Sequence, residues 1–186
     1  MNAIFAAALD LQEFCDKLGW QSCFIGGLAV QRWGEPRMTR DADLTLLTGF
    51  GSEEAFIDPL LDTFEGRRDD ARAFALKHRV LLARHPNNTP FDIALGALPF
   101  EEDSVLRSSL WNIGEGELRT CSADDLIIHK VFAGRDQDWL DVRGILVRSG
   151  QGLDLNLIEC ELKPLLELKN SLSNLDKLYQ LIEELL

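Results

Sequence analysis

Apolar and polar positions follow helical spacing in some stretches of the chain and strand spacing in others. Between residues 2 and 18, apolar side chains recur at intervals of three and four residues and Gly19 closes the run, which predicts an amphipathic helix. Short apolar runs bounded by turn residues predict strands. On these criteria we expect strands at 21–25, 42–47, 79–84 and 90–95, a short irregular hairpin at 111–121, and helices at 27–34, 52–64, 69–77, 100–109, 123–133, 136–149, 153–169 and 172–185.

Several of these boundaries depend on particular turn and capping residues. The segment 85–90 contains two prolines and paired asparagines, so the strands on either side of it are expected to form an antiparallel hairpin. Ser122 and Ser52 are expected to begin the helices that follow them. The Leu-rich C-terminal segments are expected to form a helical pair, interrupted near Lys163-Pro164 and near residues 170–173.

Length and composition indicate a folded globular protein. The chain has 186 residues, of which 46% are hydrophobic and 27% charged, enough for one core with a helical appendage. We therefore expect a core domain at 1–121 and a C-terminal helical region at 122–186, packed on that core. The first residues lack a basic start, and no apolar run approaches the roughly 18 residues of a membrane span. These features predict a cytoplasmic protein with no membrane contact.

Four scattered cysteines, Cys15, Cys23, Cys121 and Cys160, are not spaced as zinc ligands and are expected to be reduced. The net charge is −12, from 31 acidic and 19 basic residues, which disfavours broad nonspecific binding to nucleic acid. The stretch 67–84 carries a local charge of +4. It is equally compatible with a surface that meets a polyanion or nucleotide and with a solvated helix face.

The stretch 24–46 carries the strongest chemical signal. An apolar run ends in Gly26-Gly27, a helix-length spacer follows, and an Asp-x-Asp pair, Asp41 and Asp43, then leads into a second apolar run. Paired glycines at the start of a helix allow a phosphate to approach the backbone and the helix N-terminus. On a strand, alternate residues share a face, so the two carboxylates lie about 6.6 Å apart along it. This pattern predicts a site for Mg²⁺, with two ions expected, beside a phosphate-binding turn.

Asp92 is a third carboxylate in a strand pattern. It interrupts Phe91, Ile93 and Leu95, which share the opposite face of the predicted strand at 90–95. An acidic side chain among strong strand formers costs free energy unless it has a partner. Either Asp92 joins the carboxylate site, or it faces water from an edge strand.

The glycine pair, the spacer and Asp41-Ala42-Asp43 resemble the signature of the nucleotidyltransferase (polymerase beta-like) superfamily. Within it, residues 39–43 and the later run from Ser122 to Asp138 resemble the AbiEii-type toxin nucleotidyltransferases. The resemblance covers about residues 20 to 145. It implies an α+β fold, with a nucleotidyltransferase-like core built on a small mixed sheet flanked by helices, followed by C-terminal helices.

The resemblance also implies roles for individual residues. Asp41, Asp43 and Asp92 would be the catalytic and metal-binding carboxylates, Asp92 acting on the acceptor hydroxyl. Binding of the nucleotide would fall to two glycines and three basic residues, which are Gly26, Gly27, Arg40, Lys130 and Arg135. Asp138 and Asp141 share a helix face, and the alternative for them is surface ion pairing with Arg135 or Arg143.

Three hypotheses of function remain. The leading one is a Mg²⁺-dependent transfer of a nucleoside monophosphate from an NTP to a hydroxyl. The resemblance implies a tRNA end or another macromolecule as the acceptor, with the protein acting as a toxin beside an antitoxin protein. The second is the same reaction on a small molecule, as in antibiotic-modifying members of the superfamily. The third is a noncatalytic nucleotide-binding or interaction module, against which the presence of all three carboxylates argues.

Overall fold

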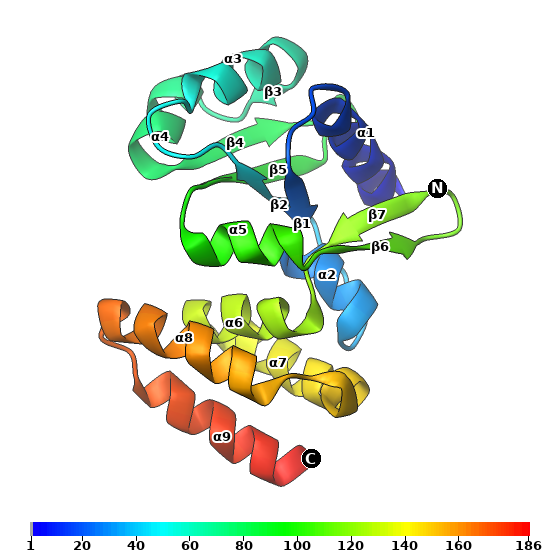
Figure 1. Cartoon of the computed structure of the whole chain (residues 1–186). Coiled ribbons are helices and arrows are strands. Elements are labelled where there is room, and N and C mark those ends of the chain that lie inside the picture. The colour runs from blue at the N-terminus through cyan, green and yellow to red at the C-terminus, as the bar shows by residue number, and fades with distance from the viewer. Residues whose placement is uncertain (1) are drawn as a thin grey trace. The chain divides into compact units, whose positions relative to one another are not determined.

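A seven-stranded mixed sheet organises the first part of the chain in the computed structural model, which describes residues 2–186 (Figure 1). Its strand order is β3-β4-β5-β2-β1-β7-β6. The pairs β2–β5 and β1–β7 are parallel, and the remaining neighbours are antiparallel. The strands are β1 Ser22–Phe24, β2 Ala42–Leu47, β3 Glu65–Gly66, β4 Val80–Arg84, β5 Pro90–Gly96, β6 Ser109–Asn112 and β7 Glu117–Thr120.

The chain divides into two compact units. Unit 1 contains the sheet and consists of the described part of Met1–Leu28 together with Met38–Cys121. Unit 2 consists of Ala29–Arg37 and Ser122–Leu186. The segment 29–37, which lies within the predicted core domain, is thus part of the helical unit.

Helices pack on the sheet of unit 1 through one continuous apolar core. They are α1 (Ala3–Lys17), α3 (Glu54–Thr63), α4 (Ala71–His78) and α5 (Pro99–Leu106), and the first turn of α2 (Gly26–Trp33) also belongs to this unit. Leu11 of α1, Leu60 of α3 and the strand residues Leu44, Phe91 and Ile93 are fully or almost fully buried in this core. Burial of such side chains is the main favourable term in folding, at roughly 25 cal/mol per Å² of apolar surface.

Unit 2 is entirely helical. It contains the rest of α2 with α6 (Ala123–Ala133), α7 (Asp136–Ser149), the short 3-10 helix η1 (Gly150–Gly152), α8 (Leu155–Lys169) and α9 (Ser173–Leu185). The end of α2 is tied to α7, because Ser149 Oγ donates to the Trp33 carbonyl and Arg148 Nη1 to the Gly34 carbonyl, both over 2.7 Å. The segment that leads toward the Asp-x-Asp pair therefore begins on this helical unit.

The predicted α+β class with a mixed sheet flanked by helices is confirmed, as are the antiparallel β4–β5 hairpin and the cap at Ser122, whose Oγ accepts from Asp125 N over 3.0 Å. β3 was not predicted. The helix predicted at 100–109 is too long, because α5 ends at Leu106 and Ser109 begins β6. Ser52 does not cap α3, since Glu53 occupies that position and makes no capping hydrogen bond there.

The predicted interruption at Lys163-Pro164 is wrong, because α8 continues through Pro164. Proline removes one intrahelical hydrogen bond. The neighbouring turns are nevertheless held in the core of unit 2 by Leu162 and Leu166, which are fully buried. Packing thus outweighs the local cost of the proline.

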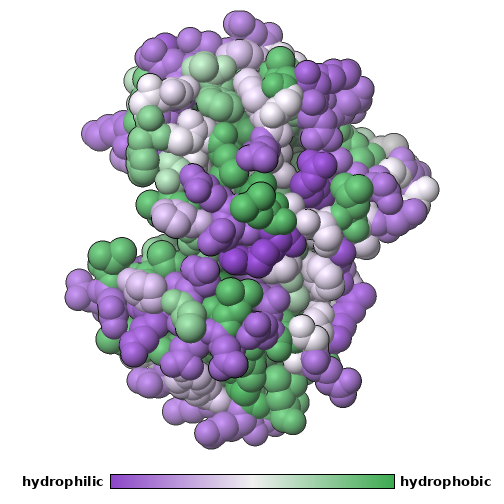
Figure 2. Space-filling view, in the orientation of Figure 1, coloured by the Kyte–Doolittle hydropathy of each residue, from purple (hydrophilic) through white to green (hydrophobic). Residues whose placement is uncertain are grey.

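The surface carries both kinds of side chain. Hydrophilic and hydrophobic residues are interspersed on the face shown in Figure 2. Cys15, Cys23 and Cys121 are buried and Cys160 is exposed, and all four are free thiols. None of the helices formed by residues 2–186 combines the length and apolar character that a membrane span requires.

Candidate active site

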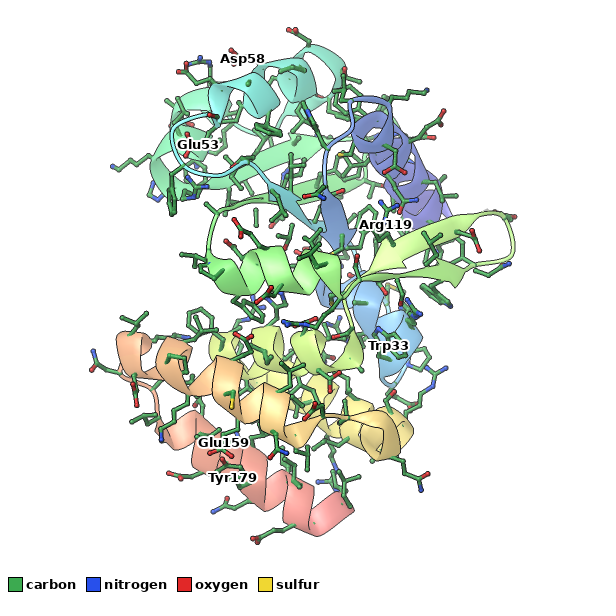
Figure 3. All side chains as sticks on the ribbon, in the orientation of Figure 1. Trp33, Glu53, Asp58, Arg119, Glu159 and Tyr179 are labelled. Atoms are coloured by element: carbon green, nitrogen blue, oxygen red, sulfur yellow. The ribbon has the colours of Figure 1, made fainter. Side chains whose placement is uncertain are left out.

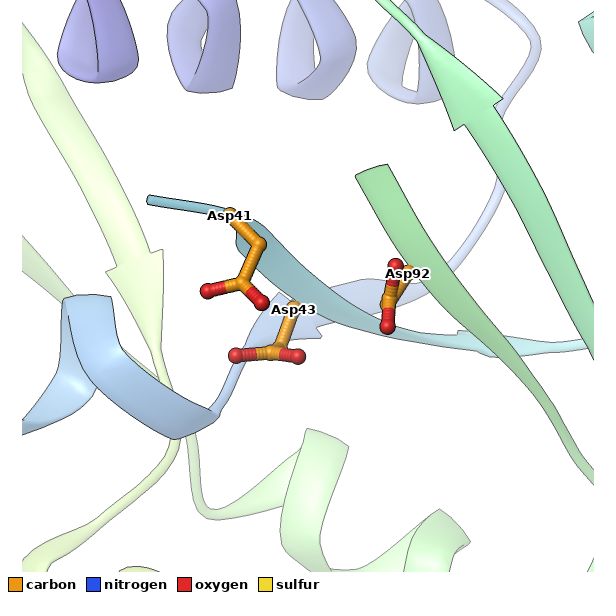
Figure 4. A group of neighbouring side chains, drawn as sticks. All are labelled: Asp41, Asp43 and Asp92. Atoms are coloured by element: carbon orange, nitrogen blue, oxygen red, sulfur yellow. The ribbon is translucent and has the colours of Figure 1, made fainter. Parts of the chain in front are cut away.

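Three carboxylates meet at one place in unit 1. Asp41 directly precedes β2, Asp43 lies on β2, and Asp92 lies on the adjacent strand β5, in register with Asp43. One carboxylate oxygen from each lies within 4.8 Å of the others, and all three residues are partly buried. Figure 4 shows the three side chains turned toward a common space. The prediction that Asp92 lies on a strand beside the Asp-x-Asp strand is therefore confirmed.

The hydrophobic pattern of the two strands produces this arrangement. Leu44 and Leu46 of β2, and Phe91 and Ile93 of β5, are buried on the opposite face from the aspartates. Because side chains alternate across a strand, burial of one set fixes the register and directs the acidic set to the other face. The parallel pairing then aligns Asp43 with Asp92.

The N-terminus of α2 lies against Asp43. Gly26 has a φ of +58°, and Gly27 N donates to Asp43 Oδ2 over 3.4 Å. A Cβ on Gly26 would lie 2.0 Å from Asp43 Oδ2, and a Cβ on Gly27 would lie 2.2 Å from Thr39 Oγ1. The paired glycines thus make room first for the chain's own side chains. The positive end of the helix faces the carboxylate cluster.

Thr39 and Arg40 lie on the segment that enters β2. Thr39 Oγ1 lies 3.2 Å from Asp41 Oδ1 and 3.3 Å from the Asp41 carbonyl, which holds the first carboxylate at the strand entrance. Thr39 belongs to the sequence motif 39–43, from which no role for its side chain was predicted. Arg40, which directly precedes Asp41 in the chain, is exposed.

Arg67 is a second residue whose place the sequence did not reveal. Its Nη2 donates to Asp92 Oδ1. Burial raises the pKa of Asp92, the nearby Asp41 charge raises it further, and the Arg67 guanidinium opposes both effects. The net result is a pKa above the ordinary value of an aspartate. Closely spaced carboxylates without a cation are expected to behave in this way.

This donor set fits a hard divalent cation. Mg²⁺ prefers carboxylate oxygens, with its remaining positions filled by water and substrate phosphates. One oxygen from each of the three aspartates lies within 4.8 Å of the others, close enough for a single cation to be shared among them. Asp41, Asp43 and Asp92 are the residues that would hold the ion.

Lys130 and Arg135 lie in unit 2, in a network of charges in which Lys130 is buried and Arg135 is exposed. Lys130 Nζ lies 3.0 Å from Asp138 Oδ1 and 2.8 Å from Asp141 Oδ2, and these three residues are 6%, 1% and 3% exposed. Arg135 Nε donates to Asp138 over 2.7 Å, and Arg37 binds Asp141 through Nε and Nη2 over 2.7 and 2.8 Å. Their predicted role in nucleotide binding stays a prediction.

Four arginines of the basic stretch 67–84 take part in ion pairs within unit 1. The pairs are Arg67 with Asp92, Arg68 with Asp70, Arg72 with Glu54 and Asp58, and Arg79 with Glu53. Figure 3 labels two of the acidic partners, Glu53 and Asp58, at the beginning of α3 and within it. Local pairing of this kind favours the solvated-face interpretation over a surface that binds a polyanion.

Comparison with known proteins finds similarity in structure only. No protein-family model and no curated protein matches the sequence. Among solved structures, an antigenic nucleotidyltransferase-like protein from Paracoccidioides brasiliensis matches with a TM-score of 0.51 at 17% identity, over 91% of this chain and 89% of that one.

An antibiotic adenylyltransferase and an antibiotic-resistance factor are also similar in fold. The lincosamide antibiotic adenylyltransferase LnuA, bound to lincomycin, has a TM-score of 0.50 at 14% identity, over 75% of this chain and 94% of its own. The antibiotic-resistance factor ANT(2'')-Ia has a TM-score of 0.52 at 13% identity, over 94% of this chain and 95% of its own. At these identities the similarity establishes the fold, and this chain has the fold of the nucleotidyltransferases.

Proposed function

We propose that this chain is a Mg²⁺-dependent nucleotidyltransferase that transfers a nucleoside monophosphate from an NTP to a hydroxyl acceptor. The observation that carries the proposal is the meeting of Asp41, Asp43 and Asp92 beside the N-terminus of α2, within a nucleotidyltransferase-like fold. Each signal alone is common in proteins. Their combination on adjacent parallel strands provides both a cation site and an anion site in one place.

The reaction forms one bond and breaks one. The acceptor oxygen attacks the α-phosphorus of the NTP, the bond between the α-phosphorus and the bridging oxygen breaks, and pyrophosphate leaves. In the proposed site Asp92 takes the proton of the acceptor hydroxyl. Mg²⁺ bound by the three aspartates would supply charge stabilisation to the phosphates as the bond breaks.

The groups that bind the triphosphate follow from the same geometry. The N-terminal turn of α2, entered through Gly26 and Gly27, offers backbone N–H groups and the positive end of the helix dipole. Arg40, which is exposed and directly precedes Asp41 in the chain, supplies a guanidinium that can bind a phosphate in a bidentate manner. Lys130 and Arg135 are included in the proposal on the strength of the sequence resemblance.

Two classes of acceptor are candidates. The names of the similar structures favour a small molecule, since two of them modify or resist antibiotics. The net charge of −12 and the ion-paired basic stretch point the same way. A tRNA end, with a toxin role beside an antitoxin protein, is supported by the sequence resemblance alone.

The experiment is a labelled transfer assay. Each α-labelled NTP is incubated with Mg²⁺ and the protein, alone, with total tRNA, and with a panel of hydroxyl-bearing antibiotics that includes lincomycin. The matched pair is wild type and Asp41→Asn, which removes one metal-binding charge with little change in volume. Transfer by wild type alone is the expected result, and the acceptor that takes up the label decides between the two classes.

Other outcomes have equally definite meanings. Transfer that survives in Asp41→Asn would refute the metal assignment. NTP binding measured by calorimetry without transfer to any acceptor would favour a nucleotide-binding module. Absence of both binding and transfer would refute the proposed function.

A further inference from the structure

Arg67 is the one described basic side chain that contacts the carboxylate cluster through Asp92. We propose that Arg67 is a positioning residue for the third carboxylate, holding one oxygen of Asp92 so that the other is presented to the metal ion and the acceptor hydroxyl. This inference rests on the proposed metal role of the three aspartates. It adds a residue that neither the sequence motif nor the fold comparison identifies.

The backbone of Arg67 is fixed next to the strand that carries Asp92. Arg67 N donates to the Leu82 carbonyl over 3.0 Å, immediately after Gly66 of β3 pairs with β4. Leu82 is in turn the register partner of Asp92 across the β4–β5 hairpin. β4 therefore lies between the backbone of Arg67 and Asp92 on β5, and the Arg67 side chain extends across β4 to reach Asp92. The hydrogen bond from the Arg67 backbone N–H to β4 fixes the position from which the side chain extends.

The contact between Arg67 and Asp92 engages one carboxylate oxygen only. Nη2 donates to Oδ1, while Arg67 Nε is buried and has no hydrogen-bond partner among the residues that the structure describes. Other arginines of this chain bind an aspartate with both Nε and Nη2. They include Arg37 with Asp141, Arg68 with Asp70, Arg72 with Asp58 and Arg135 with Asp138.

This difference separates a positioning role from simple charge neutralisation. A bidentate grip would engage both oxygens of Asp92 and compete with a metal ion for them. The single hydrogen bond leaves the second oxygen of Asp92 without a bond from Arg67, in a carboxylate that has one oxygen within 4.8 Å of oxygens of Asp41 and Asp43. Carboxylates that bind metals are commonly oriented by such hydrogen bonds, and loss of the orienting group typically lowers metal affinity about 10–100-fold.

The experiment measures metal binding directly, without substrate. Mn²⁺, as a probe for the divalent site, is titrated calorimetrically into wild type, Arg67→Gln, Arg67→Lys, Arg68→Gln and Asp41→Asn. Arg68→Gln is the matched control, because it removes the same charge one residue along the chain, from an exposed pair with Asp70. Thermal unfolding without metal shows that each variant is folded.

The expected result is a loss of Mn²⁺ affinity of about 10–100-fold in Arg67→Gln. Arg67→Lys keeps a charge and a donor and should recover part of the loss, while Arg68→Gln should stay within about twofold of wild type. In the transfer assay, Arg67→Gln at saturating metal should recover most of its kcat, because the defect lies in the metal affinity.

Two results would overturn the inference. Unchanged or tighter Mn²⁺ binding in folded Arg67→Gln would mean that Arg67 is a bystander or a competitor of the metal, with the proposed function intact. Absence of saturable binding in wild type, or equal binding by Asp41→Asn, would refute the metal site itself and the role of Arg67 with it.

Discussion

Replacement of Lys130 by methionine tests whether the buried network in unit 2 is structural. The Lys130 ammonium lies 3.0 and 2.8 Å from Asp138 and Asp141, whose side chains are each 2% exposed. Methionine keeps the volume of the side chain and removes its charge. Two buried carboxylates would then depend on Arg135, whose side chain is 77% exposed, and on Arg37, 31% exposed.

The expected cost follows from this burial. Removal of one partner from a buried ion pair typically destabilises a protein by about 3–5 kcal/mol. For a chain of this length, each kcal/mol lowers Tm by about 2–4 °C, so Lys130→Met should melt about 6–20 °C below wild type. The matched control is Lys17→Met, which removes an exposed pair with Glu13 and should cost less than about 1 kcal/mol. Urea unfolding followed by circular dichroism gives the free energy of unfolding of both variants, and thermal unfolding gives their Tm.

The pH dependence supplies a second readout. Burial alone would raise the pKa of Asp138 and Asp141, but hydrogen bonds from Arg135, Arg37 and Lys130 outweigh burial and lower both. Their contribution to stability is therefore fully present above about pH 4, the ordinary range of aspartate, and is lost as the pH falls through the lowered pKa of the folded state. The difference between Lys130→Met and wild type should shrink below about pH 4.

A small effect would refute this reasoning. If Lys130→Met unfolds within about 1 kcal/mol of wild type at neutral pH, the network does not depend on this lysine. A stable Lys130→Met protein with weakened NTP affinity would instead support the nucleotide-binding role predicted from the sequence.

Three further predictions concern stability in the absence of metal. Gly27→Ala should lower the free energy of unfolding by about 1–3 kcal/mol in urea, because its Cβ would lie 2.2 Å from Thr39 Oγ1. In the control, Gly49→Ala, the added Cβ meets no atom within 4 Å, so only the backbone strain of the positive φ is expected. Pro164→Ala should raise the free energy of unfolding by about 1–3 kcal/mol, since alanine restores the hydrogen bond missing from α8, and a less stable variant would contradict this account. Asp92→Asn should melt no lower than wild type at pH 7, because a pKa raised in the folded state means that the ionised carboxyl lowers the stability of the folded protein. A lower Tm would show that the ion pair with Arg67 outweighs the cost of burial.

Elements with a clear period or a specific cap could be predicted from the sequence. The strand at 42–47 and the helices at 123–133 and 136–149 have the predicted bounds, because apolar spacing, Ser122 and Gly134 all point to the same limits. β3 could not be predicted, since two residues, Glu65 and Gly66, carry no periodicity and become a strand only through pairing with β4. Pro164 misled for the same reason, because the burial that holds α8 together is not visible in local sequence.

The same contrast applies to the candidate site, where some residues could be predicted from local sequence and others could not. Asp41 and Asp43 could be identified because an Asp-x-Asp pair follows the glycines and a helix-length spacer and leads into an apolar run. Asp92 could be identified because it interrupts an apolar strand pattern, and such an interruption requires a reason. The role of Arg67 could not be identified, since it is one of two adjacent arginines in a basic run. Only the β3–β4 pairing shows that Arg67 reaches Asp92 while Arg68 turns to Asp70. A contact across strands leaves no trace in local composition.

The geometry at the N-terminus of α2 changes what the paired glycines mean. From sequence they make room for a phosphate, yet in the structure the space over Gly26 and Gly27 is taken by Asp43 and Thr39. The helix end thus already faces an anion of the chain, through Gly27 N and Asp43 Oδ2. Two anions at one helix end repel each other, so a triphosphate can share it with Asp43 only when cations neutralise the carboxylates. Under the proposed function, the glycines therefore couple nucleotide binding to metal binding, because they bring the metal-binding carboxylate to the end of the helix that would receive the phosphate.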